Sequence, residues 1–226
     1  LSVEQALKFS EVPDIIKPTG MSAALDYGTG LLQITCSETI ESLNLAKIKL
    51  VNIHGDTDYV IDDGLIIEQD TVTVTIKLSE SDRLNVLRVS GTPGGDNVSV
   101  TLELDAGALT DPAENQNLDQ TNIAVVETAD TIPPIAESAS LDFNNGRLII
   151  TCSETVDVTP ASLVDLSLIY IADLTGDQAV PLTGATVVNS ADDPVLTLTL
   201  TEAQRAAAIA ISGVPGGDGD SVVLDV

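Results

Sequence analysis

The stretch at residues 25–40 reads LDYGTGLLQITCSETI, and residues 141–156 read LDFNNGRLIITCSETV. The two stretches match without a gap at an offset of 116 positions, from 25 to 141. A second pair matches at an offset of 122, from 89 to 211, where VSGTPGGDNVSVTLEL is answered by ISGVPGGDGDSVVLDV. Internal repetition on this scale predicts two copies of one domain.

Each copy carries the pattern of short strands. Apolar and polar residues alternate in TVTVTIKL at 71–78 and in VLTLTLT at 195–201, which is typical of half-buried strands. Other strands are expected at 58–67 and 121–128, and one short helix at 80–88, with Ser79 as its N-cap and Gly91 at its end. We therefore predict an all-β fold of two tandem immunoglobulin-like β-sandwich domains.

The amino-acid composition argues against some functions. Thirty-five acidic residues against nine basic ones give a net charge of -26, which argues against nucleic acid as a partner because phosphate binding needs a basic face. No apolar run approaches the roughly 20 residues that span a bilayer, so membrane insertion is not expected. The missing initiator Met is expected where a targeting segment has been removed, or where the chain is a piece of a longer protein.

Residues that could carry enzymatic chemistry are few. His54 is the single histidine, and no glycine-rich phosphate loop with its Lys is present. Cys36 and Cys152 occupy one position of the two copies, so they should lie too far apart for a disulfide and should behave as small buried hydrophobes. We predict that the protein is not an enzyme.

Three short motifs resemble those of the immunoglobulin-like repeats found in bacterial and archaeal surface-layer proteins and large adhesins. They are the opening Asp130-Thr131-Ile132-Pro133-Pro134, the strand end Cys36-Ser37-Glu38 with its copy at 152–154, and the turn Asp111-Pro112-Ala113-Glu114-Asn115. This chain departs from the family pattern with Cys in place of Phe and Glu in place of Gly. The resemblance implies an immunoglobulin-like fold and an extracellular or cell-surface location.

The two copies differ in their last strand. Repeat 1 runs on into the strand expected at 121–128, whereas repeat 2 reaches Val226, the counterpart of Leu104, without one. Residues 3–14 have the position of that strand when they are shifted by 116, although few identities support the match. We expect domains at 14–130 and 131–226, the second incomplete, and an N-terminal donor strand at 1–13.

This arrangement favours strand exchange between copies of the chain, because an open sheet edge is a template for another strand. The donor side chains would be Val3, Leu7, Phe9 and Val12, and the acceptor edge would comprise Val222, Leu224 and Val226. The contact is head-to-tail, so it extends into a filament. Its assembly resembles that of donor-strand filaments such as chaperone–usher pili, archaeal bundling pili and cannulae. The partner is then the chain itself, together with neighbouring filaments or a cell surface.

The alternative is a two-domain fragment of a cell-surface adhesin or surface-layer protein that acts as a binding or spacer module. For either function, structural Ca²⁺ is the ligand that the acidic composition suggests, because hard cations bind several oxygen ligands. Asp and Asn in these loops could equally serve as turn residues. The candidate ligands are Glu38, Asp105, Asp111, Asn115 and Asp130, with Asp96 and Asp218 as a second group.

Overall fold

The computed structural model describes residues 9–52, 58–61 and 63–226. The chain divides into two compact units, Leu1–Ile132 and Pro133–Val226, which we call unit 1 and unit 2. Both are built mainly of strands, so the predicted all-β class is confirmed, while the immunoglobulin-like assignment stays a prediction. Val3 and Leu7 of the expected donor strand, and His54, lie outside the described residues.

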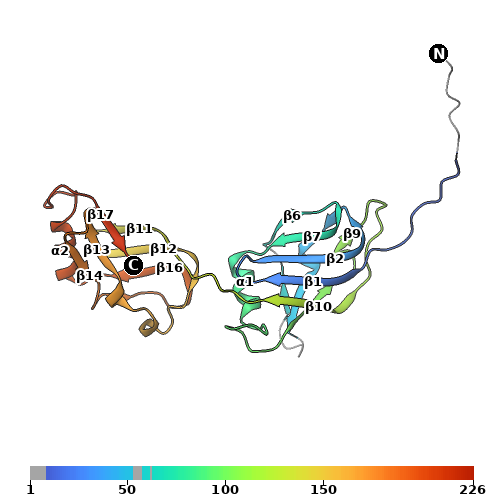
Figure 1. Ribbon diagram of the computed structural model, residues 1–226, viewed down its shortest axis with the longest axis horizontal. Helices are drawn as coiled ribbons and strands as arrows, with labels where there is room; N and C mark the ends of the chain where they lie inside the picture. The colour runs from blue at the N-terminus through green and yellow to red at the C-terminus, as the bar shows by residue number, and fades with distance from the viewer. Residues whose placement is uncertain (1–8, 53–57, 62) are drawn as a thin grey trace, which may run out of the picture. The chain divides into compact units, whose positions relative to one another are not determined.

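Unit 1 contains one sheet of eight strands in the order β5-β4-β8-β10-β1-β2-β7-β6 (Figure 1). Their bounds are β1 (Gly20–Asp26), β2 (Leu31–Ile40), β4 (Ile48–Asn52), β5 (Asp58–Val60), β6 (Leu65–Glu68), β7 (Thr71–Lys77), β8 (Val100–Leu104) and β10 (Gln120–Thr128). The short strands β3 (Ser42–Leu43) and β9 (Leu109–Thr110) pair separately, and unit 1 also contains η1 (Leu45–Lys47) and α1 (Glu80–Leu87).

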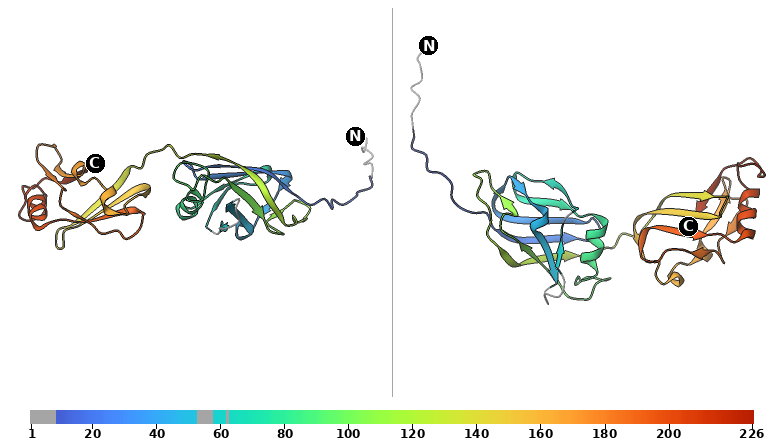
Figure 2. Two further views of the ribbon diagram at one scale, coloured as in Figure 1. Left: turned by 90° about the horizontal axis from the view of Figure 1, so that it is seen from below. Right: turned by 180° about the vertical axis from the view of Figure 1, so that it is seen from behind.

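The central strand β10 holds the two halves of this sheet together. It pairs in parallel with β1, which lies beside it in Figure 1, and antiparallel with β8 on its other side. Figure 2 shows the two halves as layers that face each other. One apolar core, to which Ile34, Leu102 and Ile123 contribute, lies between them. β10 therefore links the two layers of unit 1 through its hydrogen bonds to β1 and β8.

Unit 2 repeats this layout as two separate sheets, in the orders β11-β12-β16-β15 and β14-β13-β17. The first sheet comprises β11 (Ala136–Asp142), β12 (Arg147–Val156), β15 (Thr186–Val187) and β16 (Asp193–Thr199). The second comprises β13 (Tyr170–Asp173), β14 (Ala179–Pro181) and β17 (Val222–Asp225), and the helical segments are η2 (Ala161–Leu163), η3 (Leu166–Leu168) and α2 (Glu202–Ala210).

The repeat offsets identify the equivalent strands. β11 and β12 correspond to β1 and β2, and β17 corresponds to β8. Within Pro133–Val226, all of which the structure describes, no strand takes the place of β10. The two sheets of unit 2 therefore share a core but are not hydrogen-bonded to each other through a joining strand.

The helix caps confirm the predicted helix starts, but two details of the prediction are wrong. Ser79 accepts a hydrogen bond from the Asp82 N–H at 3.1 Å, as an N-cap does. The strand expected at 58–67 is divided into β5 and β6, because β5 pairs with β4 and β6 pairs with β7 at the other end of the sheet. Helix α1 ends before Gly91, and the left-handed turn lies at Gly94 (φ 96°), so Gly91 does not cap the helix.

Candidate functional site

A groove runs along unit 2 between β11 and β17. These are the equivalents of β1 and β8, the two strands that β10 joins in unit 1. Nine of its twelve lining residues are apolar, namely Ala136, Ala139, Leu141, Leu148, Ile171, Val222, Val223, Leu224 and Val226, and the other three are Glu137, Ser138 and Ser140. The groove thus occupies the position in unit 2 that β10 fills in unit 1.

Side chains that β10 covers in unit 1 have exposed counterparts in unit 2. Ala23 is 4% exposed, whereas its equivalent Ala139 is exposed. Leu104 is fully buried, and its equivalent Val226 is 64% exposed. Both edges also present backbone N–H and C=O groups that a further strand could pair with.

All three acceptor residues named from the sequence, Val222, Leu224 and Val226, line this groove. Sequence reasoning missed the opposite wall, β11, although the offset of 116 from β1 would have indicated it. Of the named donor residues, Phe9 and Val12 are described, and they are 80% and 88% exposed.

Strand β10 shows what an occupant of such a groove does. Ile123 enters the core of unit 1, opposite Leu102 of β8. Glu127 accepts a hydrogen bond from the Tyr27 hydroxyl at 2.8 Å and from the Val100 N–H at 3.3 Å. Burial raises the pKa of Tyr27 well above its ordinary value, and the Glu127 carboxylate raises that pKa further.

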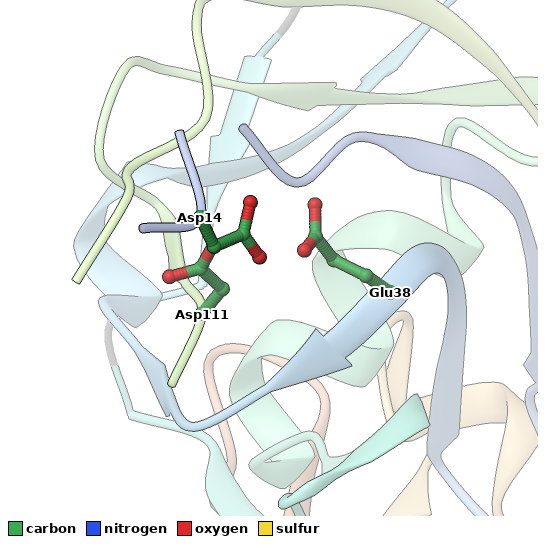
Figure 3. Close-up of side chains that lie close together, drawn as sticks. All are labelled: Asp14, Glu38 and Asp111. Carbon is green, nitrogen blue, oxygen red and sulfur yellow. The ribbon is translucent and has the colours of Figure 1, made fainter. Parts of the chain in front are cut away.

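A second feature is a cluster of three carboxylates, Asp14, Glu38 and Asp111, whose oxygens lie within 4.8 Å of one another. Figure 3 shows the three carboxyl groups close together, with those of Asp14 and Glu38 facing each other. Glu38 comes from β2, Asp111 from the turn after β9, and Asp14 from the segment before β1. Residues from three parts of unit 1 therefore meet here.

Two carboxylates of this acidic cluster have pKa values that are shifted in opposite directions. Burial raises the pKa of Glu38, and the neighbouring charges of Asp111 and Asp14 raise it further. Among the described residues, Glu38 Oε1 has no hydrogen-bond partner although it is buried. Burial also opposes ionisation of Asp111, but hydrogen bonds from Asn115 and Ala113 outweigh it and lower the pKa of Asp111. Three carboxylates in this geometry could hold a hard cation.

The cluster contains Glu38 and Asp111 from the predicted ligand set, with Asn115 beside them, because the Asn115 side chain bonds Asp111 Oδ2 at 2.8 Å. The remaining four predicted ligands do not converge, since each has another partner: Asp105 pairs with Lys49 at 2.8 Å, Asp130 with Arg83 at 2.8 Å, Asp96 with Asn52 at 2.7 Å, and Asp218 with the Asp220 N–H at 3.1 Å. Asp14 was missed, because only folding brings it beside Glu38.

The two cysteines are free thiols. Burial raises the pKa of Cys36 to about 11, so this thiol is almost entirely protonated at neutral pH. Cys152, which was also expected to be buried, is only partly buried; burial raises its pKa, and the charge of Glu137 raises it further. The absence of enzymatic activity stays a prediction.

No protein-family model matches the chain, and no curated protein has a matching sequence. The N-terminal part of the bacterial S-layer protein SbsC is similar in structure at 12% sequence identity and a TM-score of 0.33, over 83% of this chain and 45% of that one. The BSP domain of a biofilm-associated protein follows at 16% identity and a TM-score of 0.20, over 82% and 24%.

The chain spans less than half the length of either of these proteins. At such TM-scores neither likeness decides the fold or the function. Within the described ranges, no helix is long and apolar enough to cross a membrane.

Proposed function

We propose that this protein is a structural subunit of an extracellular filament. In this proposal, the N-terminal segment of one copy inserts as a strand into the groove of unit 2 of the next copy. The observation that carries the proposal is the groove between β11 and β17, whose counterpart in unit 1 is filled by β10. The likeness in sequence position between residues 3–14 and the β10 region supplies the occupant.

The register of β10 defines the expected register of the donor. In unit 1, Val125 lies opposite Ala23, and Ile123 lies opposite Leu102. Transferred by the two offsets, Phe9 would pair with Ala139 and Leu7 with Leu224, in a strand parallel to β11 and antiparallel to β17. The same offset places Val12 on exposed Thr128 and Val3 on exposed Asp119, so we assign the groove contacts to Leu7 and Phe9.

The free energies of burial and hydrogen bonding favour a stable contact between subunits. Burying Leu7 and Phe9 contributes about 1.5–3 kcal/mol each, and each new backbone hydrogen bond contributes about 0.5–1.5 kcal/mol. These terms oppose the entropy lost on association. Because donor and acceptor lie on different surfaces, the contact is heterologous and extends into a filament unless it closes into a ring.

A second candidate is a module of a cell-surface adhesin or surface-layer protein, with its groove filled by another segment of the same longer chain. This candidate is favoured by the groove itself, because backbone pairing supplies much of the affinity in strand addition and other strands of suitable pattern could therefore fill it. This candidate predicts a chain that does not polymerise.

The deciding experiment is electron microscopy of the purified chain beside variants of the donor. We expect filaments from the full chain and monomers from a chain lacking residues 1–12. Phe9→Asp should also abolish assembly, because it introduces a charge into an apolar groove. Ser10→Asp is the matched control: its counterpart Val126 is 68% exposed, so filaments should persist.

Two results would overturn this proposal. Filaments formed equally well by the truncated chain would show that another surface joins the subunits. A full chain that stays monomeric at high concentration, with calcium present, would favour the adhesin or surface-layer module.

We further propose that Ca²⁺ binds Asp14, Glu38 and Asp111 and fastens the N-terminal segment to unit 1. The buried, unpartnered Glu38 Oε1 supports this site. Free Ca²⁺ at about 100 times Kd should stabilise unit 1 by about 2.7 kcal/mol. Glu38→Gln should abolish this gain in thermal unfolding, whereas Glu154→Gln, the equivalent change in β12, should not. An equal gain in both variants and the wild type would exclude this site.

A further inference from the structure

Arg83 and Arg205 occupy the same position in the two units, in α1 and α2. Each forms a two-pronged ion pair with the Glu three residues earlier, Arg83 with Glu80 and Arg205 with Glu202. Each also donates from Nη1 to an equivalent carbonyl, which belongs to Tyr27 at 3.0 Å and to Phe143 at 2.7 Å. The two arginines are therefore held in the same way within their own units.

Arg83 has one contact more. Its Nη1 donates to Asp130 Oδ2 at 2.8 Å, just after the end of β10. Among the residues that the structure describes, Arg205 has no carboxylate partner besides Glu202. The Arg205 side chain is 28% exposed, against 7% for Arg83. Within the described residues, Arg205 thus repeats the arginine of this ion pair without a counterpart of Asp130 beside it.

The space beside Arg205 is open as well. A pocket there is lined by Leu141, Asp142, Phe143, Asn144, Arg205, Ile209, Val214 and Pro215. In unit 1 the corresponding turn is covered: a Cβ on Gly28, the counterpart of Asn144, would lie 3.2 Å from Asp130 Oδ1 and 3.3 Å from Ile132 Cδ1. The residues that follow β10 therefore occupy in unit 1 the region that is open in unit 2.

The segment that follows the donor strand carries matching residues. The offset of 116 places Asp14 on Asp130 and Ile16 on Ile132. Both aspartates form the same local turn, in which Oδ1 accepts a hydrogen bond of 2.9 Å from the N–H two residues later. Ile16 is 68% exposed, so its side chain is available to a partner.

We infer that Asp14 of the incoming copy forms an ion pair with Arg205 of the receiving copy, while Ile16 covers the pocket beside it. This inference rests on the proposed strand exchange and adds a contact at the end of the inserted strand. We call this contact, the Asp14–Arg205 ion pair with Ile16 over the pocket, the latch. An Arg–carboxylate pair adds directional specificity to the joint. A strand shifted by two residues would keep its apolar face inward but would lose the latch, so the latch selects one register.

Two local features shape the latch. Asn144 carries a side chain where unit 1 has Gly28, and it bonds back onto Asp142 at 2.9 Å, so the incoming turn would sit a few tenths of an ångström further out than in unit 1. A carboxylate has about four lone-pair sites. The Asp14 carboxylate therefore has acceptor sites left for Arg205 besides the one that the Ile16 N–H occupies.

The test is a double-mutant cycle in the full-length chain, with the critical concentration of filament assembly as the readout. Asp14→Asn and Arg205→Met should each raise this concentration roughly 10- to 100-fold, as expected for a charge-assisted hydrogen bond. The double variant should be no worse than the poorer single variant, because both remove one interaction. Asp130→Asn is the control, since it breaks the equivalent pair inside unit 1 and should leave the joint unchanged.

The possible failures are distinguishable. If the wild type forms no filaments, the proposed function is wrong. If it forms filaments that need residues 1–12, but Asp14→Asn is neutral, strand exchange stands and the latch is wrong. An effect of Asp14→Asn that persists in full beside Arg205→Met would assign that aspartate to the acidic cluster alone and would also overturn the latch.

Discussion

At the scale of single residues, a larger side chain at one position of unit 2 is accompanied by a smaller side chain at a neighbouring position. A Cβ on Gly20 would lie 2.7 Å from Leu104 Cδ1, so a side chain there would require the Leu104 side chain to shift. Unit 2 has Ala136 at that position and the shorter Val226 in place of leucine. A methyl group gained on β11 is therefore offset by one lost after β17, and the groove keeps space for a strand.

Replacing Arg83 and replacing Arg205 should lower the stability of the monomer by unequal amounts. Arg83→Met should lower the free energy of unfolding of unit 1 by about 2–3 kcal/mol, because it removes charge-assisted bonds and leaves Asp130 partly buried without its cation. Arg205→Met should cost unit 2 less, about 1 kcal/mol, since Glu202 is 75% exposed. Denaturant unfolding of both variants below the assembly concentration tests this, and equal costs would contradict it.

Tyr27 should make the stability of unit 1 fall at alkaline pH. Its pKa lies above the ordinary 10.0 in the folded state, so the folded hydroxyl keeps its proton while the unfolded one loses it. This contribution to stability is complete below pH 10 and falls as the pH rises above it. Unfolding in denaturant should show a steeper alkaline loss for the wild type than for Tyr27→Phe. Equal slopes would show that Tyr27 is not responsible.

At the scale of elements, β10 is the strand that decides whether a unit is closed. Its inward side chain Ile123 joins the core of unit 1, and its counterpart in the donor segment is Leu7. The same substitution at these two positions should therefore act on different properties of the protein.

Ile123→Ala should destabilise unit 1 by about 2–4 kcal/mol, because it leaves a cavity in a packed core. Leu7→Ala should leave the unfolding of the monomer unchanged and should raise the critical concentration of assembly at least tenfold. Chemical unfolding and filament sedimentation measure the two effects. A loss of monomer stability in Leu7→Ala would mean that this segment already packs within its own chain.

At the scale of the whole molecule, the net charge of -26 opposes any contact between copies. Raising monovalent salt shortens the Debye length from about 30 Å at 0.01 M to about 8 Å at 0.15 M, which weakens this repulsion. The critical concentration should therefore fall as salt increases over this range. A rise instead would mean that local attraction, such as that of Asp14 for Arg205, outweighs the repulsion between whole subunits.

Much of the fold could be predicted because its signals are local. Period-two alternation located most strands, the side chains of Ser79 and Thr201 marked the helix starts, and the repeat located the second unit. The last strand, β10, was also expected from the alternation at 121–128. These features depend on neighbours within a few residues, so they can be read along the chain.

The candidate sites were predicted less completely. From the sequence came the apolar acceptor positions on β17 and the acidic residues Glu38 and Asp111. The opposite wall on β11, the pairing of Asp105 and Asp130 with cations, and the place of Asp14 and Arg205 were decided by the tertiary structure. The physical reason is that hydrophobic periodicity acts along one strand, whereas a groove, an acidic cluster and an ion pair require residues about fifty to a hundred positions apart to meet. Only the folded chain brings them together.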